Sequence, residues 1–170
     1  ARALSRQYRV VCPDVVGRGD SDWLSDKNAY GIPQYVADML VLLARLNVEQ
    51  GDWVGTSMGG LSGMTLAAQV DTPIRRMVLN DVGPVITKVS LQRIASYVGK
   101  DQSWDSFETA EAYFKTVCAP FGKLDDAQWR QLTQYSFVQN DAGRWHFGYD
   151  MEIRLPFRAA HLFQDMDLWP

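Results

Sequence analysis

The chain has 170 residues, of which 46% are hydrophobic and 22% charged, and these values fit one globular domain with a buried core. Its formal net charge of −3 gives no electrostatic reason to expect a nucleic acid or an anionic membrane as partner. No apolar run has the roughly 18 residues of a transmembrane helix, and the polar N-terminus does not resemble a signal peptide. Cys12 and Cys118 fit no metal-ligand spacing, so we expect reduced thiols, no metal, no cofactor and a cytoplasmic protein.

The first half of the chain alternates between β-rich runs and helical periodicity. Pro33 suits the first turn of the first helix, and Asn47 suits its end. Strand, helix, strand, helix, strand at this spacing predicts crossover connections and a parallel sheet, and hence the α/β class. The predicted elements are a strand at 8–12, a helix at 32–46, a strand at 52–56, a helix at 58–70 and a strand at 75–80.

After Pro84 this alternation stops and aromatic residues become frequent. We therefore expect a sheet-bearing part at 1–86 and a helical region at 87–170. The aromatic side chains either favour an apolar or ring-bearing substrate or bury against one another. Periodicity predicts helices at about 90–98, 107–118, 126–138 and 153–163.

The run Gly55-Thr56-Ser57-Met58-Gly59 matches G-x-S-x-G between a strand and a helix. A sharp turn at this place strains the serine backbone and lifts its Oγ clear of the sheet. We expect both flanking glycines to be needed because side chains there would collide with neighbouring elements. Ser57 would begin a helix, where the dipole favours negative charge and the Met58 N–H can donate to an oxyanion. The run therefore predicts a nucleophilic serine with one backbone oxyanion donor.

Together with two other motifs, this elbow (residues 55–59) makes the chain resemble the α/β-hydrolase superfamily. Its extended form G-T-S-M-G-G resembles the esterases and lactonases of that superfamily. The other motifs are Pro13-Asp14 with Gly17-Arg18-Gly19-Asp20-Ser21, which resembles the loop after the fourth strand, and Leu79-Asn80-Asp81-Val82-Gly83-Pro84, which resembles the segment after the sixth.

The resemblance implies a partial doubly wound parallel sheet of the α/β-hydrolase fold with a helical cap at 87–170. It implies a serine hydrolase that cleaves carboxylic esters or lactones through an acyl-enzyme on Ser57. It also implies an internal fragment of a longer hydrolase, because nothing in the sequence resembles the earlier strands, the second oxyanion donor or the later histidine-bearing strand.

A nucleophilic serine needs a base and a carboxylate that orients the base. Asp81 ends a parallel strand at the edge where α/β sheets place their sites, so it is a candidate acid, with a structural role in the following turn as the alternative. Asp14 is expected to tie down the loop after it. His146 and His161 are expected to be polar residues of the cap, with Trp145 and His146 as candidate substrate-binding residues. The catalytic histidine is then expected outside this chain.

Other interpretations stay open. A carbon–carbon bond hydrolase of the same fold uses the same elbow, and a non-catalytic α/β-hydrolase-like binding protein can keep the serine. The isolated 170-residue chain is expected to be inactive. The expected partner is a small-molecule ester or lactone, without nucleic acid or membrane, and the sequence leaves the oligomeric state open.

Overall fold

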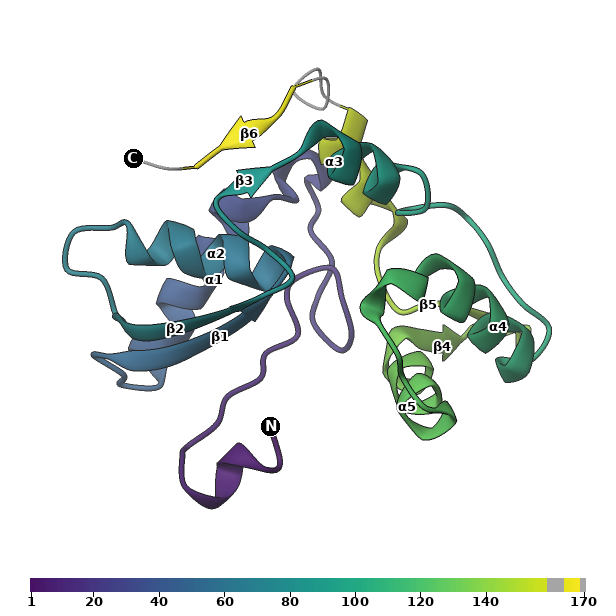
Figure 1. Cartoon of the computed structure of the whole chain (residues 1–170), viewed down its shortest axis with the longest axis horizontal. Coiled ribbons are helices and arrows are strands. Elements are labelled where there is room, and N and C mark those ends of the chain that lie inside the picture. The colour runs from purple at the N-terminus through teal and green to yellow at the C-terminus, as the bar shows by residue number, and fades with distance from the viewer. Residues whose placement is uncertain (159–163, 169–170) are drawn as a thin grey trace. The chain divides into compact units, whose positions relative to one another are not determined.

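The computed structural model describes residues 1–158 and 164–168. The chain forms two compact units, and each is discontinuous in sequence (Figure 1). The first unit comprises residues 1–23 and 101–150, and the second unit comprises residues 24–100 and 151–170. The expected boundary between residues 86 and 87 stays a prediction. None of the described helices has the length and apolar character needed to cross a bilayer.

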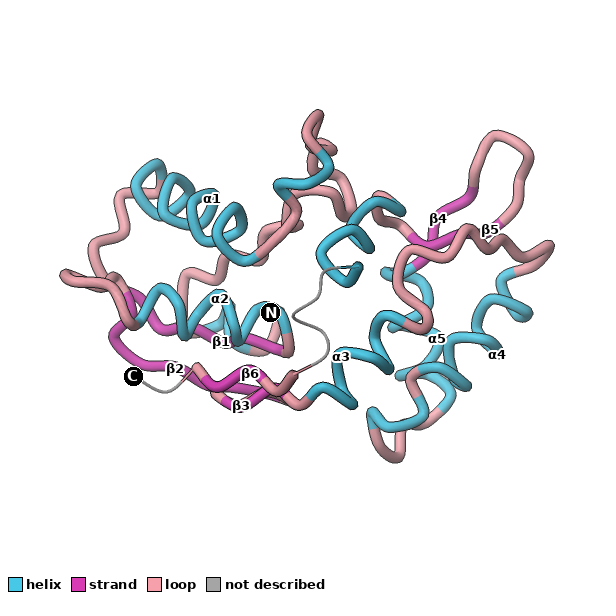
Figure 2. The backbone as a smooth tube through the Cα atoms, turned by 90° about the horizontal axis from the view of Figure 1, so that it is seen from above, coloured by secondary structure: helices cyan, strands magenta, loops and turns pink. Residues whose placement is uncertain are grey.

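A pair of parallel strands forms one layer of the second unit. The strands β1 (Gly51–Thr56) and β2 (Ile74–Asn80) align Trp53 with Met77 and Thr56 with Asn80. Helix α2 (Met58–Ala67) packs on both strands, and helix α1 (Ile32–Arg45) packs on α2. Figure 2 shows this layering, with α2 between α1 and the strands. These four elements were predicted from the sequence, and their arrangement confirms the α/β class.

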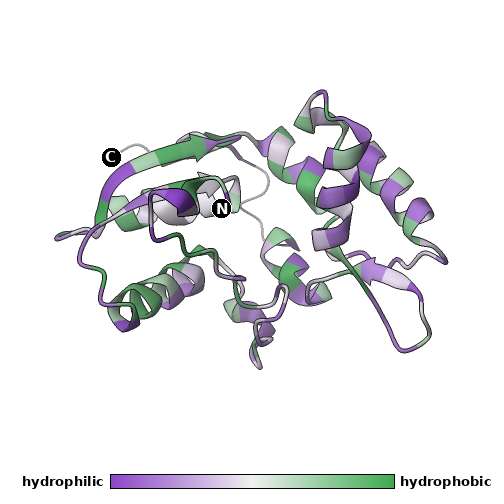
Figure 3. Ribbon diagram, turned by 90° about the horizontal axis from the view of Figure 1, so that it is seen from below, coloured by the Kyte–Doolittle hydropathy of each residue, from purple (hydrophilic) through white to green (hydrophobic). Residues whose placement is uncertain are grey.

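The core of this unit forms where the two helices meet the sheet. Val36, Met39 and Leu66 are buried there, and Trp53 and Ile74 pack against them. In Figure 3, hydrophobic colouring is frequent along α1, which supplies Val36 and Met39 to this core. The hydrophobic periodicity that predicted α1 is therefore the pattern that its burial requires.

The boundaries of α1 follow from two residues. Pro33 lies in the first turn, where its missing N–H removes no helical bond. Asn47 follows the helix with a φ of 54°, a left-handed conformation that asparagine tolerates better than most residues. Both features agree with the sequence prediction.

The rest of the second unit contains short elements. Thr87 caps α3 by accepting the Ser90 N–H. The antiparallel pair of β3 and β6 adds strand structure after Pro84, where the sequence indicated helical stretches. Part of the helix expected at 153–163 is a 3-10 helix here, and residues 159–163 lie outside the described part of the chain. The elements are η2 (Lys27–Ala29), β3 (Val85–Ile86), α3 (Lys88–Ala95), η4 (Met151–Arg158) and β6 (Met166–Asp167).

Two α-helices and a hairpin are the main elements of the first unit. Each helix begins with a capping box, in which two residues three positions apart satisfy each other's backbone N–H groups. Ser106 pairs with Thr109 in this way, and Asp125 pairs with Gln128. The elements are η1 (Leu4–Arg6), α4 (Phe107–Val117), η3 (Ala119–Phe121), α5 (Asp126–Ser136), β4 (Phe137–Gln139) and β5 (Trp145–Phe147).

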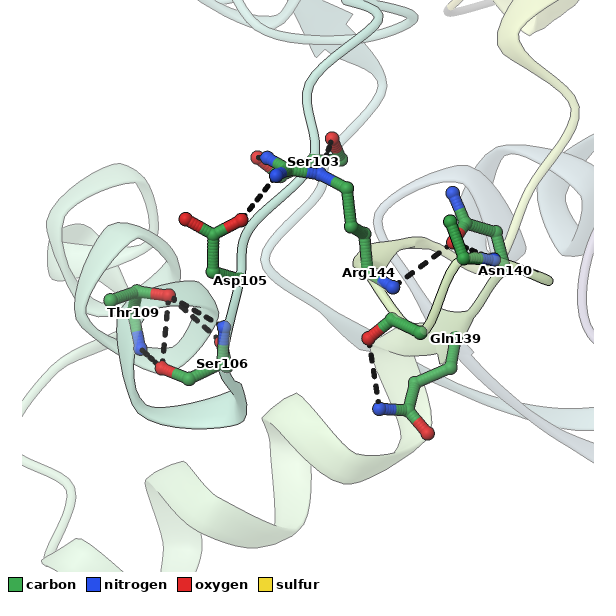
Figure 4. A network of polar contacts seen from close by, with 9 residues as sticks. Ser103, Asp105, Ser106, Thr109, Gln139, Asn140 and Arg144 are labelled. Carbon is green, nitrogen blue, oxygen red and sulfur yellow. Dashed lines mark hydrogen bonds and ion pairs between the residues drawn. The ribbon is translucent and has the colours of Figure 1, made fainter.

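The antiparallel β4–β5 hairpin corrects the prediction that the helix at 126–138 continues through residue 138. The side-chain oxygen of Asn140 accepts two backbone N–H groups of the connecting turn, at 3.0 and 3.1 Å. Arg144 follows that turn and donates to the Ser103 hydroxyl, the Ser103 carbonyl and the Asp105 carboxylate (Figure 4). These bonds fix a chain reversal directly after the segment that we expected to be helical.

An aromatic core fills the first unit. The rings of Phe137 and Phe147 stack with centroids 4.4 Å apart, and Trp104 meets both rings edge-on. Such pairs contribute about 0.5–1.5 kcal/mol beyond the area that they bury. These aromatic residues therefore bury against one another, which was one of the two alternatives. The buried members of the core are Ala110, Phe114, Cys118, Trp129, Phe137 and Phe147.

The strand predicted at 8–12 is wrong, since this segment has no strand structure. Extended backbone becomes a strand only when a neighbour takes up its N–H and C=O groups. The bridges of the first unit outside its hairpin instead join Arg18 to Tyr149 and Trp104 to Trp145. Val11 is accordingly 45% exposed. The β-rich composition indicated a tendency to form a strand, but no described segment forms a strand pair with residues 8–12.

Candidate active site

Ser57 forms the sharp turn between β1 and α2. Its backbone has φ 48° and ψ −115°, a conformation that costs a non-glycine residue about 1–3 kcal/mol. The Ser57 N–H donates to the carbonyl of Asn80 at 3.0 Å, and the Ser57 carbonyl accepts from Gly60 at 2.8 Å and Leu61 at 3.1 Å. The residue is exposed. The strained backbone expected from the sequence is therefore present, and hydrogen bonds to β2 and α2 hold it in this conformation.

Two glycines around Ser57 are required by close contacts. Gly55 was expected to be one of them, but the other is Gly60 and not Gly59. A Cβ on Gly55 would lie 2.4 Å from the carbonyl oxygen of Gly59, and a Cβ on Gly60 would lie 2.3 Å from Cγ1 of Val82. A Cβ on Gly59 would meet no atom of the described residues within 4 Å. The expectation that Gly59 avoids a collision is therefore wrong, because its α-carbon faces open space, and Gly60 makes the close approach instead.

Met58 is the first residue of α2. Backbone N–H groups in the first turn of a helix are directed out of its N-terminal end, where the helix dipole favours negative charge. The Met58 N–H thus belongs to the turn that also presents Ser57. This placement agrees with the geometry that the sequence predicted for an oxyanion donor, and the role itself remains a proposal.

Asp81 lies at the same edge of the sheet as Ser57. It follows Asn80, whose carbonyl holds the Ser57 N–H, and it precedes Val82, whose side chain lies against Gly60. Asp81 is exposed and has a φ of 55°. No described residue donates a hydrogen bond to its carboxylate, so the turn-stabilising bonds considered for it are not formed there.

Trp145 and His146 lie in β5 of the first unit. The N–H and C=O of Trp145 exchange two hydrogen bonds of 2.8 Å with Trp104, and its ring meets Phe107 edge-on at 5.1 Å. His146 is half-buried, and its Nδ1 lies 2.9 Å from the carbonyl of Phe147. Ser57, Met58 and Asp81 are thus gathered in the second unit, whereas Trp145 and His146 belong to the first. His161 lies outside the described residues.

Asp14 ties down the loop that follows it, as predicted. Its carboxylate accepts the Asp20 N–H at 3.1 Å, and its carbonyl accepts the Ser21 hydroxyl at 2.7 Å. Gly19 has a φ of +54°, and a Cβ there would lie 2.4 Å from Cγ of Asp14. Arg18 donates to the Val16 carbonyl at 3.1 Å. These contacts hold the loop after Asp14 in one conformation.

Shifted pKa values occur at groups away from the elbow, among them Asp52, Tyr113 and Lys115. The hydrogen-bonded Arg75 guanidinium holds the pKa of Asp52 below its ordinary value, at the opposite end of β1 from Ser57. Burial raises the pKa of Tyr113 in the aromatic core of the first unit. Among the described residues, no group of three His, Cys, Asp or Glu side chains could hold a metal ion.

One residue near Ser57 was not identified from the sequence. The indole Nε1 of Trp53 donates to the carbonyl of Gly59 at 2.9 Å. The only sequence signal is indirect: the alternation of a strand places residues 53 and 55 on one face. The side-chain bond itself depends on how α2 lies over that face.

Comparisons with known proteins identify the family of the chain. The sequence profile of the family described as "alpha/beta hydrolase fold" matches residues 1–145. The 3-hydroxybutyrate-oligomer hydrolase of Cupriavidus necator is 49% identical over 163 residues, which are 94% of this chain and 56% of that protein.

Two solved structures superpose on the chain with high scores. A hydrolase of Rickettsia typhi has a TM-score of 0.89 and 31% identity, covering 99% of this chain and 57% of that one. An alpha/beta hydrolase of Novosphingobium aromaticivorans has a TM-score of 0.84 and 36% identity, covering 93% of this chain and 57% of that one. The chain therefore spans a little over half the length of these proteins.

Proposed function

The chain belongs to the family with the alpha/beta hydrolase fold, and on this premise we propose that it carries the nucleophile of a serine hydrolase that acts on carboxylic esters. The observation that carries the proposal is the backbone of Ser57, held at φ 48° and ψ −115° at the head of α2. Strain of this kind persists only where surrounding bonds enforce it, and it concentrates at functional sites.

The proposed chemistry begins with attack of the Ser57 Oγ on the ester carbonyl. The Oγ–carbon bond forms, the carbonyl π electrons move to oxygen, and the Met58 N–H donates to the resulting oxyanion. One such donor contributes about 3 kcal/mol in the transition state. Collapse expels the alcohol and leaves an acyl-enzyme, which water then hydrolyses to the acid and free Ser57.

The Ser57 proton must pass to a base. We propose a histidine of the whole protein other than His146, because His146 lies in a short antiparallel hairpin and not after a strand of the parallel sheet. Asp81 is the proposed acid, since its two neighbours fix it beside the elbow: Asn80 bonds Ser57 and Val82 packs on Gly60. The role of Asp81 is to orient the histidine and to stabilise its cationic form.

For the substrate, we propose short oligoesters of hydroxy acids. The support is the 49% identity, over 94% of this chain, to a protein named 3-hydroxybutyrate-oligomer hydrolase. Candidate contacts with the substrate are Trp145 and His146. We also propose that the protein acts in the cytoplasm.

The test uses protein expressed from the complete coding sequence. A fluorophosphonate should label Ser57, located by peptide mass spectrometry, and Ser57→Ala should abolish both labelling and ester turnover. Ser96→Ala is the matched control, because the exposed Ser96 hydroxyl donates to the nearby Arg93 carbonyl and to no other described residue. A folded protein that is neither labelled nor able to turn over any ester would refute the proposal and leave a binding protein of the same fold.

A substrate panel separates the remaining candidates. Dimers and trimers of 3-hydroxybutyrate should give a higher kcat/KM than a lactone or a carbon–carbon bond substrate. The isolated 170-residue chain should show negligible multiple turnover. Clear turnover by that chain, lost in Ser57→Ala and in His146→Ala, would instead make His146 the base.

A further inference from the structure

One peptide group of α2 lies directly over β1. It joins Gly59 to Gly60, and a Cβ on Gly55 would lie 2.4 Å from its oxygen and 2.6 Å from its nitrogen. This peptide is bonded at both ends. Its C=O accepts the indole N–H of Trp53 at 2.9 Å, and its N–H donates to the carbonyl of Ser57 at 2.8 Å. The side chain of Trp53 is thus connected to the backbone of Ser57 through a single peptide.

A peptide group is planar, so fixing its oxygen also limits the direction of its N–H. The Trp53 indole therefore restricts where the Gly60 N–H points, and that N–H in turn holds the Ser57 carbonyl. The direction of this carbonyl is the ψ of Ser57, which is −115°. On the other side of the residue, the Asn80 carbonyl holds the Ser57 N–H. Strand β2 thus restrains one side of the strained residue, and Trp53 restrains the other.

The indole has a built position against α2. A Cβ on Gly63 would lie 2.5 Å from Nε1 and 2.6 Å from Cδ1 of Trp53, and 3.0 Å from Sδ of Met77. Trp53 is half-buried and pairs in register with Met77 of β2. The absence of a side chain at Gly63 lets the ring reach the Gly59 carbonyl. The hydrogen bond to the Gly59 carbonyl needs an indole at position 53, because the ring supplies its donor through the N–H at Nε1.

We infer that Trp53 is a positioning residue for the Ser57 nucleophile, acting through the Gly59–Gly60 peptide. The inference rests on the proposed function. Its consequence is that loss of the indole N–H changes the reactivity of Ser57 even when the ring shape and the fold are retained. A purely structural Trp53 would lower stability and leave the reactivity of folded molecules unchanged.

The experiment replaces the Trp53 indole by benzothiophene, which keeps the bicyclic shape and removes the N–H. Trp53→Phe is the second variant. The control is the same replacement at Trp129, which is buried in the aromatic core of the first unit. All are made in protein from the complete coding sequence and measured well below the unfolding midpoint. The readouts are the rate constant of Ser57 phosphonylation, kcat and KM on an ester, and amide hydrogen exchange in the first turn of α2.

At position 53 we expect phosphonylation and kcat to fall about 3- to 10-fold, as loss of one hydrogen bond implies, with KM within twofold. We expect amide exchange at Gly60 and Leu61 to become faster. The Trp129 replacement should change none of these. Unchanged phosphonylation in the benzothiophene variant, or a change in KM alone, overturns the inference.

Failure of the proposed function gives a different result. Wild-type Ser57 then does not react with the phosphonate at all. In that case amide exchange tests the inference alone. Faster exchange in the position-53 variants supports the restraint of the Ser57 turn by Trp53, and unchanged exchange overturns it.

Discussion

Gly55→Ala and Gly59→Ala form a matched pair that tests the close packing of the elbow. Both changes add one methyl group to a glycine of the same motif. At Gly55 the new Cβ would lie 2.4 Å from the backbone oxygen of Gly59, whereas at Gly59 it would meet nothing within 4 Å in the described part of the chain. Carbon atoms in contact normally stay about 3.5–4.0 Å apart, so Gly55→Ala requires α2 to move by roughly 1 Å away from β1.

The two substitutions are expected to change the free energy of unfolding in different directions. Overpacking against backbone costs about 1–3 kcal/mol, so Gly55→Ala should destabilise the protein by at least that amount. Gly59 lies within α2, and alanine is favoured over glycine in a helix by about 0.5–1 kcal/mol. Gly59→Ala should therefore be neutral or stabilising.

Urea unfolding of both variants, followed by circular dichroism, measures this difference. Phosphonylation of Ser57 under native conditions provides a second assay, and only Gly55→Ala should slow it, because the displaced peptide also holds the Ser57 carbonyl. Equal stability losses in the two variants, or a larger loss in Gly59→Ala, would refute the reasoning from contacts.

Three further predictions follow from the site and the aromatic core. Asp81→Asn should lower kcat about 10³- to 10⁴-fold if Asp81 orients the base, whereas Asp14→Asn should change kcat only severalfold; similar initial rates in the two variants would exclude Asp81 as the acid. Phe147→Ala should lower the free energy of unfolding by about 3–5 kcal/mol, and a loss below about 1 kcal/mol in urea would contradict the described packing. Burial raises the pKa of Tyr113, so its contribution to stability is complete below the ordinary tyrosine pKa and declines as the pH rises through the folded value. The ultraviolet difference titration between wild type and Tyr113→Phe should show this late ionisation, and ionisation at or below the ordinary pKa would contradict it.

The sequence predicted the elements whose signals are local. The apolar periodicity of α1, with Pro33 and Asn47 at its ends, needs no tertiary information. The strained turn at Ser57 also follows from a short motif between a strand and a helix. Contacts made across elements were harder to predict, and the motif pattern alone assigned to Gly59 the close approach that Gly60 makes.

The β4–β5 hairpin shows why some local signals were misjudged. Asn140 and Gly143 are turn formers, but the preceding helical pattern was extended through residue 138. The side-chain bonds of Asn140 and the contacts of Arg144 with Ser103 decide the outcome. Ser103 is far from Arg144 in the sequence, so no window around residue 140 contains that information.

The discontinuity of the first unit has a consequence for how the protein is made. Its N-terminal loop is joined to the end of the hairpin by the bonds Gly19 N–H to Gly148 C=O and Asp150 N–H to Gly17 C=O. Contacts this distant in sequence close slowly, because the entropy of the intervening chain opposes them. During synthesis the loop must wait for residue 150 to emerge, while the strands and helices of the elbow are already complete. Engineers who exchange the hairpin and its helices between relatives should therefore transplant residues 13–22 with them.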